Sequence, residues 1–200
     1  MPVFDRRYTA NCRIYNMLAA APRHLSFHTP GHKEGKWDIT ELSFSDNLAD
    51  PTGVLKEAQA DVAQILGAAR SFLLTDGSTC GVLSMLYAAK PEKLVFSAAA
   101  HKSVYNACRL LGIEQVVLDV VYRGGIPQQP SLGAIASALQ NAGTGAGKGA
   151  VAVLLTSPDY YGNVAGFAAV RRICDEYGAM LLCDGAHGGH LHGTPLHAGA

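Results

Sequence analysis

The sequence predicts an α/β fold of three layers, in which helices cover both faces of a mainly parallel sheet. Short apolar segments alternate with amphipathic segments along most of the chain. The apolar segments are hydrophobic at almost every position, as strands are when both faces of their sheet are covered. Hydrophobic residues make up 48% of the chain and charged residues 16%, so the chain can bury a substantial core.

The first part of the chain contains two predicted helices separated by a polar segment. Residues 5–21 place apolar side chains at helical spacing. The turn-rich segment SFHTPGHKEGKWD follows at residues 26–38, and residues 56–69 form the second predicted helix. The predicted apolar face of this second helix consists of Ala58, Val62, Ile65 and Leu66.

Strand and helix patterns then alternate to the end of the sequence. The predicted strands comprise residues 72–74, 94–96, 115–121, 151–155 and 180–183. The predicted helices between them comprise residues 78–89, 101–111, 132–142 and 167–177. The glycine-rich stretch at residues 141–150 precedes a strand instead of following one, so we expect a surface loop and not a phosphate loop. We expect residues 1–50 to form an N-terminal part and residues 51–200 the main α/β domain.

Charge and hydropathy exclude several classes of partner. Lysine plus arginine equals aspartate plus glutamate, 16 each, which gives no electrostatic reason to expect nucleic acid or an anionic membrane. No apolar run reaches the length of a membrane span, and the first residues lack a signal-peptide pattern. The five cysteines form no CxxC pair, which predicts reduced, mostly buried thiols in a cytoplasmic protein.

Polar residues gather after four of the predicted strands. In open α/β sheets, ligands bind at the carboxyl ends of the strands, so the four clusters together predict one site. The clusters are TDGST at residues 75–79, AAAHKS at 98–103, TSPDYYG at 156–162 and CDGAHGG at 183–189.

Two of these clusters open a predicted helix. Gly77 allows a tight turn, and Ser78 and Thr79 follow where backbone N–H groups are free, which suits a phosphate group or an ordinary helix cap. His101 could stack on a cofactor ring or bond to the backbone at its helix start. Ser103 could contact a phosphate or a ring oxygen, or could be a simple first-turn serine.

The last cluster places a carboxylate at the end of an apolar strand. Asp184 could pair with a protonated ring nitrogen, or could be a cap or a structural ion pair. His187 could orient Asp184 or touch a substrate, or could bond to carbonyl groups of its turn. Four histidines near the end of the sequence suggest a metal site, but we expect none, because the two closest in sequence, His190 and His192, lie in a glycine-rich turn without rigid support. The four histidines are His187, His190, His192 and His197.

Taken together, these segments resemble the pyridoxal-phosphate (PLP) binding major domain of the Orn/Lys/Arg decarboxylase family, which has the aspartate-aminotransferase-like, type I PLP fold. The PGHK and HKS elements, in this order, are specific to that family. The matching segments are FHTPGHKEG at 27–35, DPTGVLKEAQ at 50–59, DGSTCG at 76–81, AHKSVYNA at 100–107, LTSPDYYG at 155–162 and LLCDGAHGGH at 181–190.

The resemblance implies PLP as the cofactor and a role for each candidate residue. Ser78 and Thr79 would hold the cofactor phosphate above the Gly77 turn. His101 would stack on the pyridine ring, with Ser103 near the phosphate.

At the other end of the site, Asp184 would pair with the pyridine nitrogen. His187 would contact the cofactor or the substrate carboxylate. The PGHK segment, residues 28–33, would lie near the entrance of the active site.

The sequence departs from the family pattern at two points. Gly185 stands where the family usually has an acidic residue. The family's Schiff-base lysine belongs to a serine–x–histidine–lysine element, and no such element occurs in the 200 residues. We therefore expect the N-terminal portion of a longer, short-form member, with a sheet that is incomplete at the C-terminus and no activity on its own.

The implied reaction of the intact enzyme is decarboxylation of arginine, lysine or ornithine to a polyamine-type amine, in a homodimer or higher homo-oligomer. Two alternatives stay open. One is another type I PLP enzyme, such as an aminotransferase or a carbon–sulfur lyase. The other is a non-catalytic scaffold protein that keeps the fold.

Overall fold

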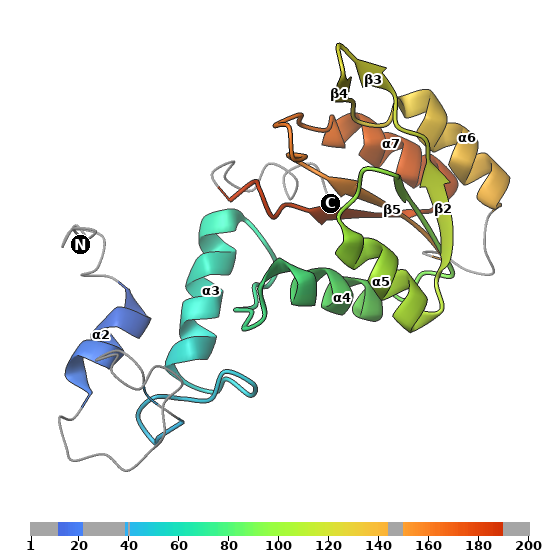
Figure 1. The fold of residues 1–200 in the computed structure, drawn as a ribbon. Helices are drawn as coiled ribbons and strands as arrows, with labels where there is room; N and C mark the ends of the chain where they lie inside the picture. The colour runs from blue at the N-terminus through green and yellow to red at the C-terminus, as the bar shows by residue number, and fades with distance from the viewer. Residues whose placement is uncertain (1–11, 22–38, 40, 144–149, 190–200) are drawn as a thin grey trace. The chain divides into compact units, whose positions relative to one another are not determined.

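The computed structural model describes residues 12–21, 39, 41–143 and 150–189 (Figure 1). These residues belong to two compact units, one up to Leu73 and one from Leu74 onward. The boundary expected after residue 50, between an N-terminal part and the main α/β domain, stays a prediction.

Two helices make up most of the described part of the first unit. Helix α2 spans Arg13–Ala20 and packs against helix α3, which spans Val54–Leu66. The Arg13 guanidinium joins them, since its Nε lies 2.6 Å from Asp61 and its Nη1 lies 2.8 Å from Glu57. All three side chains are well exposed, so these ion pairs add little to stability.

Helix α3 begins beside a carboxylate that lies seven residues before its N-cap, Gly53. The Asp46 carboxylate accepts hydrogen bonds from the backbone N–H groups of Thr52, Gly53 and Leu55. It thereby takes the role of a capping side chain, which glycine cannot play.

The predicted apolar face of α3 is wrong. The buried residues of α3 are Leu55 and Ala63, whereas Val62 is 37% exposed and Ile65 79% exposed. Apolar spacing shows which residues share a face, but the face that is buried depends on how the helix packs.

The strand predicted at residues 72–74 is also absent, and Phe72 is 71% exposed. The backbone N–H of Leu73 donates to the side chain of Gln59 at 3.0 Å. Because no neighbouring strand pairs with them, three apolar residues are not enough to form a strand.

The second unit is built on a parallel sheet with the strand order β2-β1-β5-β6. Two of its strands are apolar at every position but the last, as the sequence predicts. The strands are β1 (Lys93–Ser97), β2 (Glu114–Leu118), β5 (Val151–Thr156) and β6 (Met180–Asp184).

Helices cover both faces of this sheet, which confirms the predicted three layers (Figure 1). Helices α4 (Gly77–Ala89) and α5 (Lys102–Leu111) pack on one face. Helices α6 (Leu132–Ala142) and α7 (Phe167–Tyr177) pack on the other, and their bounds match the prediction.

Alternate strand residues enter the two cores. Leu94, Phe96 and Leu154 point toward α4 and α5, whereas Val95 and Val153 point toward α6 and α7. All five side chains are essentially fully buried, and each one buried this way stabilises the fold by about 1.5–3 kcal/mol.

A two-stranded hairpin, which the sequence did not predict, follows β2. Its strands are β3 (Tyr122–Arg123) and β4 (Ile126–Pro127), paired antiparallel. Gly124 and Gly125 form its turn with φ of 59° and 79°, values that favour glycine. The strand predicted at residues 115–121 therefore ends early, at Leu118.

Candidate functional site

Three of the predicted polar clusters lie at one edge of the sheet. All four strands are parallel, so their carboxyl ends share that edge. The AAAHKS cluster follows β1, the TSPDYYG cluster begins at the last residue of β5, and the CDGAHGG cluster includes the last residue of β6. Thr156 and Asp184 are register partners in neighbouring strands.

Asp184 directs its side chain toward the face that α4 and α5 cover. Side chains alternate between the faces of a sheet, and Leu182, two residues earlier, packs in the core under α4 and α5. Leu154 does the same two residues before Thr156. The side chains of Thr156 and Asp184 therefore point to the same face.

The start of α4 lies at the same edge, although no strand precedes it. Helix α4 ends at Ala89, just before β1 begins, and its Val82 and Leu86 pack against that strand's core side chains. A helix that runs back along the sheet in this way places its first turn, Gly77 to Thr79, near the carboxyl ends of the strands.

The first turn of α4 offers free donors. Gly77 has φ +67°, which favours glycine, and the N-cap residue Asp76 makes no side-chain cap. Within the described part of the chain, the exposed hydroxyls of Ser78 and Thr79 form no hydrogen bond. Backbone N–H groups at such a helix start bind anions such as phosphate.

His101 caps helix α5 with its ring. Its Nδ1 accepts a hydrogen bond from the backbone N–H of Ser103 at 3.2 Å, and the buried Ser103 hydroxyl lies 2.8 Å from the same atom. Because a backbone N–H can only donate, Nδ1 is the acceptor and the ring proton sits on Nε2. The imidazole is exposed, and the two contacts from Ser103 to Nδ1 hold it in one orientation.

Asp184 is a buried carboxylate with little to balance its charge. It is 6% exposed, and its Oδ1 accepts one hydrogen bond, from the backbone N–H of Ala186 at 3.2 Å. No ion pair involves Asp184 in the residues that the structure describes. A buried charge is costly unless it is paired, so this carboxylate suits a cationic ligand atom.

The neighbour of Asp184 along the strand is a neutral thiol. Burial raises the pKa of Cys183 to about 11, and the Asp184 charge adds to the effect. Cys183 is therefore protonated at neutral pH and brings no second charge to the site.

His187 lies in the turn after β6 and contacts an aromatic residue of the neighbouring loop. Its ring meets the Tyr160 ring edge to face, with centroids 6.2 Å apart, and Tyr160 meets Tyr161 in the same way at 5.5 Å. No hydrogen bond joins His187 to Asp184 in the described structure. The sequence analysis did not single out the two tyrosines. Two aromatic residues just after the end of a strand could have indicated a ring contact at the site.

A hydrogen-bond network holds the loop that carries these tyrosines. Asp159 accepts from the backbone N–H groups of Tyr161 and Asn163, at 2.9 Å each. The Asn163 amide donates to Pro127 of the hairpin, and Gln129 donates to the backbone oxygens of Thr156 and Asn163.

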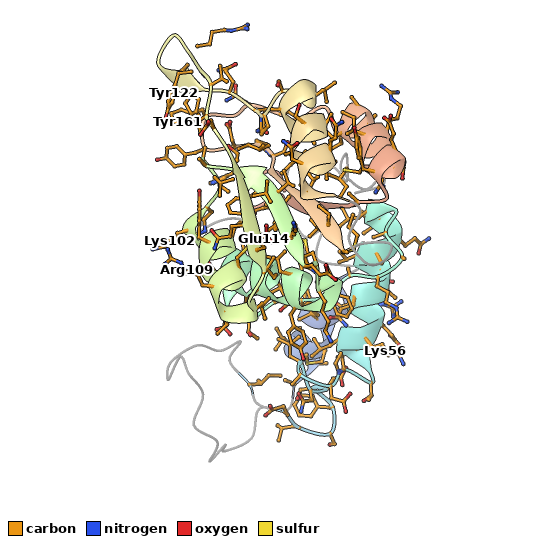
Figure 2. All side chains as sticks on the ribbon, turned by 90° about the vertical axis from the view of Figure 1, so that its right-hand side faces the viewer. Lys56, Lys102, Arg109, Glu114, Tyr122 and Tyr161 are labelled. Atoms are coloured by element: carbon orange, nitrogen blue, oxygen red, sulfur yellow. The ribbon has the colours of Figure 1, made fainter. Side chains whose placement is uncertain are left out.

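The hairpin and the loop therefore form one connected structure at the edge of the sheet. Figure 2 shows Tyr122 of the hairpin and Tyr161 of the loop at the same end of the unit.

Several predicted site residues lie outside the described residues. These are the PGHK segment at residues 28–33 and the histidines at 190, 192 and 197. In the part of the chain that is described, no three potential metal ligands gather, and no helix is both long and apolar enough to cross a membrane.

The described residues fit a phosphorylated, protonated heterocycle. The free first turn of α4 can hold a phosphate, the fixed His101 ring can lie against a flat ring, and the Asp184 carboxylate can hold a ring N–H. These three features converge on one edge and one face of the sheet.

Comparison with known proteins identifies relatives for most of the chain. A family model for the Orn/Lys/Arg decarboxylase major domain matches residues 36–200. The uncharacterized protein YaaO of Bacillus subtilis (strain 168) is 36% identical over 202 residues, which cover 90% of this chain and 41% of YaaO. An arginine decarboxylase of Halalkalibacterium halodurans is 26% identical over 201 residues, which cover 90% of this chain and 40% of the relative.

Solved structures add a likeness in fold. Serine palmitoyltransferase of Sphingomonas wittichii superposes with a TM-score of 0.52 at 16% identity, over 69% of this chain and 32% of that one. The chain thus spans well under half the length of the proteins that it matches.

Proposed function

Because the chain belongs to the Orn/Lys/Arg decarboxylase family, whose cofactor is PLP, we propose that it acts in the decarboxylation of a basic amino acid to its amine. Its fold is that of PLP-dependent transferases, as the sequence predicted. We further propose that the reaction needs sequence beyond these 200 residues, because they contain no serine–x–histidine–lysine element.

The observation that carries this proposal is the buried, unpaired carboxylate of Asp184. When bound, PLP supplies an electron-accepting ring for the electron pair released as the bond between Cα and the carboxylate breaks. Asp184 keeps the ring nitrogen protonated, since a nearby negative charge favours the cationic form. Its charge thereby stabilises the electron-rich transition state.

The remaining residues bind and orient. Ser78 and Thr79, together with the backbone of their turn, hold the phosphate. His101 supports the ring, and Ser103 fixes the imidazole by the hydrogen bonds at Nδ1. His187, packed against Tyr160, borders the place where the substrate carboxylate would lie.

The proposal is tested by replacing the carboxylate with its neutral isostere. Asp184→Asn in the complete gene product should lower carbon dioxide release from arginine, lysine or ornithine by about a hundredfold or more, because the charge that holds the ring proton is lost. Asp119→Asn is the matched control, since Asp119 is an exposed aspartate just after β2 at the same edge. Wild-type turnover in Asp184→Asn would remove Asp184 from this role.

Product analysis separates the proposal from the other PLP chemistries. An amine with one carbon fewer than the substrate indicates decarboxylation. A keto acid would indicate an aminotransferase. Comparing the three basic amino acids as substrates identifies which of them the enzyme prefers.

A further inference from the structure

A single side-chain amide, that of Gln129 just after the hairpin, joins both ends of the loop that follows β5. Its nitrogen donates to the backbone oxygen of Thr156 at 3.0 Å and to that of Asn163 at 3.1 Å. Thr156 is the last residue of β5, and the Asn163 oxygen also accepts from the backbone N–H of Asp159 inside the loop. Both acceptors are carbonyl oxygens, so the amide presents its NH₂ group to them, with one hydrogen for each oxygen.

The loop is bonded to the hairpin in return. The Asn163 amide nitrogen donates to the backbone oxygen of Pro127 in β4 at 3.0 Å and to the Asp159 carboxylate at 2.8 Å. That carboxylate also accepts from the backbone N–H groups of Tyr161 and Asn163. The bonds inside the loop fix its shape, whereas the bonds from Gln129 and Asn163 fix its place against the strand end and the hairpin.

The hairpin buries little apolar surface of its own. The side chains of Tyr122 and Ile126 are 65% and 46% exposed. Burial stabilises in proportion to the apolar area removed from water, so these two side chains contribute little. Hydrogen bonds therefore tie the hairpin to the loop, and Figure 2 shows Tyr122 at the same end of the unit as Tyr161 of the loop.

The loop carries an aromatic side chain to the candidate site. Tyr160 lies between the two loop ends that Gln129 joins, and its ring meets the His187 ring edge to face with centroids 6.2 Å apart. Tyr160 is 83% exposed, so its position depends on the loop backbone and not on core packing. A shift of the loop would therefore move the ring that borders His187.

We propose that Gln129 is a positioning residue for the substrate, which acts through the loop on Tyr160 and His187. The inference rests on the proposed function, in which His187 borders the place of the substrate carboxylate. The hydrogen bonds of the Gln129 amide reach the loop and not the side chains matched to the cofactor. Loss of this amide should therefore weaken substrate binding and leave cofactor binding unchanged.

The test compares two neighbouring glutamines in the complete enzyme. Gln129→Met keeps the length of the side chain and removes both hydrogen bonds. It should raise the KM for the basic amino acid about tenfold, with little change in kcat, because the substrate carboxylate is misplaced. Gln128→Met is the matched control and should leave KM unchanged, because the Gln128 amide donates to Ile126 and Pro127 of its own hairpin. The Kd for PLP should be the same in all three proteins.

Two further measurements separate positioning from a purely structural role. Hydrogen exchange at the Tyr161 and Asn163 amides should be faster in Gln129→Met, because a loop with fewer restraints opens more readily. In a Tyr160→Leu background, Gln129→Met should raise KM little further, because the two changes act by the same route and are not additive.

An unchanged KM in Gln129→Met, an equal rise in Gln128→Met, or full additivity with Tyr160→Leu would overturn this inference alone. Gln129→Asn, whose shorter amide cannot reach both oxygens, replaces the methionine variant if that protein folds poorly, and the same outcomes decide. Wild-type enzyme that releases no carbon dioxide from arginine, lysine or ornithine would overturn the proposed function, and this inference with it. The two failures are therefore distinguishable.

Discussion

At the residue scale, the site combines side chains that the sequence identifies with one that it does not. Asp184 was predicted because a charge at the carboxyl end of a buried strand is unusual, and His101 because it begins a helix directly after a strand. Gln129 was not singled out, because no pattern in the sequence reveals that its amide bonds to both ends of the loop after β5. Such contacts depend on the packing of several elements.

One buried thiol, Cys174, and one half-buried thiol, Cys183, predict a loss of stability at high pH. Burial raises the pKa of Cys174 and Cys183 from 9.0 to about 11. Because their pKa is raised in the folded state, the protonated thiols contribute fully to the free energy of unfolding below pH 9.0. This contribution is lost as pH rises through about 11. Urea unfolding across that window should therefore show a falling free energy of unfolding.

The matched control for that experiment is the double variant Cys174→Ala, Cys183→Ala. The free energy of unfolding of this variant is lower at neutral pH. It should fall less across the same pH window, because the two thiols with raised pKa values are gone. Equal slopes in the two proteins would show that the thiols make no contribution.

At the scale of single elements, helix α3 depends on a residue outside it. Backbone hydrogen bonds, above all the one from Thr52, hold the pKa of the Asp46 carboxyl well below its usual range. A lowered pKa means that the stabilisation is present above the usual pKa of an aspartate and is lost as pH falls through the lower, folded value.

Asp46→Ala should therefore weaken the start of α3 at neutral pH, because Gly53 and Leu55 lose their acceptor. Hydrogen exchange of the amides in α3 should become faster. Asp50→Ala is the control, since Asp50 is exposed and forms no hydrogen bond in the described part of the structure. Unchanged exchange in Asp46→Ala would rule out the capping role.

Helices were easier to predict than short strands. The bounds of α6 and α7 follow directly from apolar spacing, whereas the hairpin of β3 and β4 was missed. Its Gly124–Gly125 turn is a known hairpin signal, but strands of two residues carry no periodicity. Residues 72–74 show the converse, since apolar residues without a pairing partner form no strand.

At the scale of the whole molecule, the three layers and the parallel sheet follow from the sequence, but the strand order does not. The alternation of strand and helix patterns predicts which elements exist, and it also predicts that the strands are parallel. The position of β5 between β1 and β6 depends on long-range pairing, which the pattern of one segment does not encode.

The missing lysine element leads to a prediction for the chain of 200 residues by itself. Mixed with PLP, this chain should release no carbon dioxide from arginine, lysine or ornithine, because it has no serine–x–histidine–lysine element to hold the cofactor covalently. The complete gene product under the same conditions is the positive control. Carbon dioxide release by the short chain would show that these residues suffice.

The position of β5 has a consequence for folding. Its pairing with β1 joins segments that are separated by α5, β2, the hairpin and α6, and such long-range closures are slow. The edge that holds Thr156 and Asp184 exists only after this closure. A ligand that binds only the folded chain stabilises it by about 2.7 kcal/mol at a hundredfold excess over its Kd. The supply of cofactor in the cell would then set how much of the protein survives proteolysis.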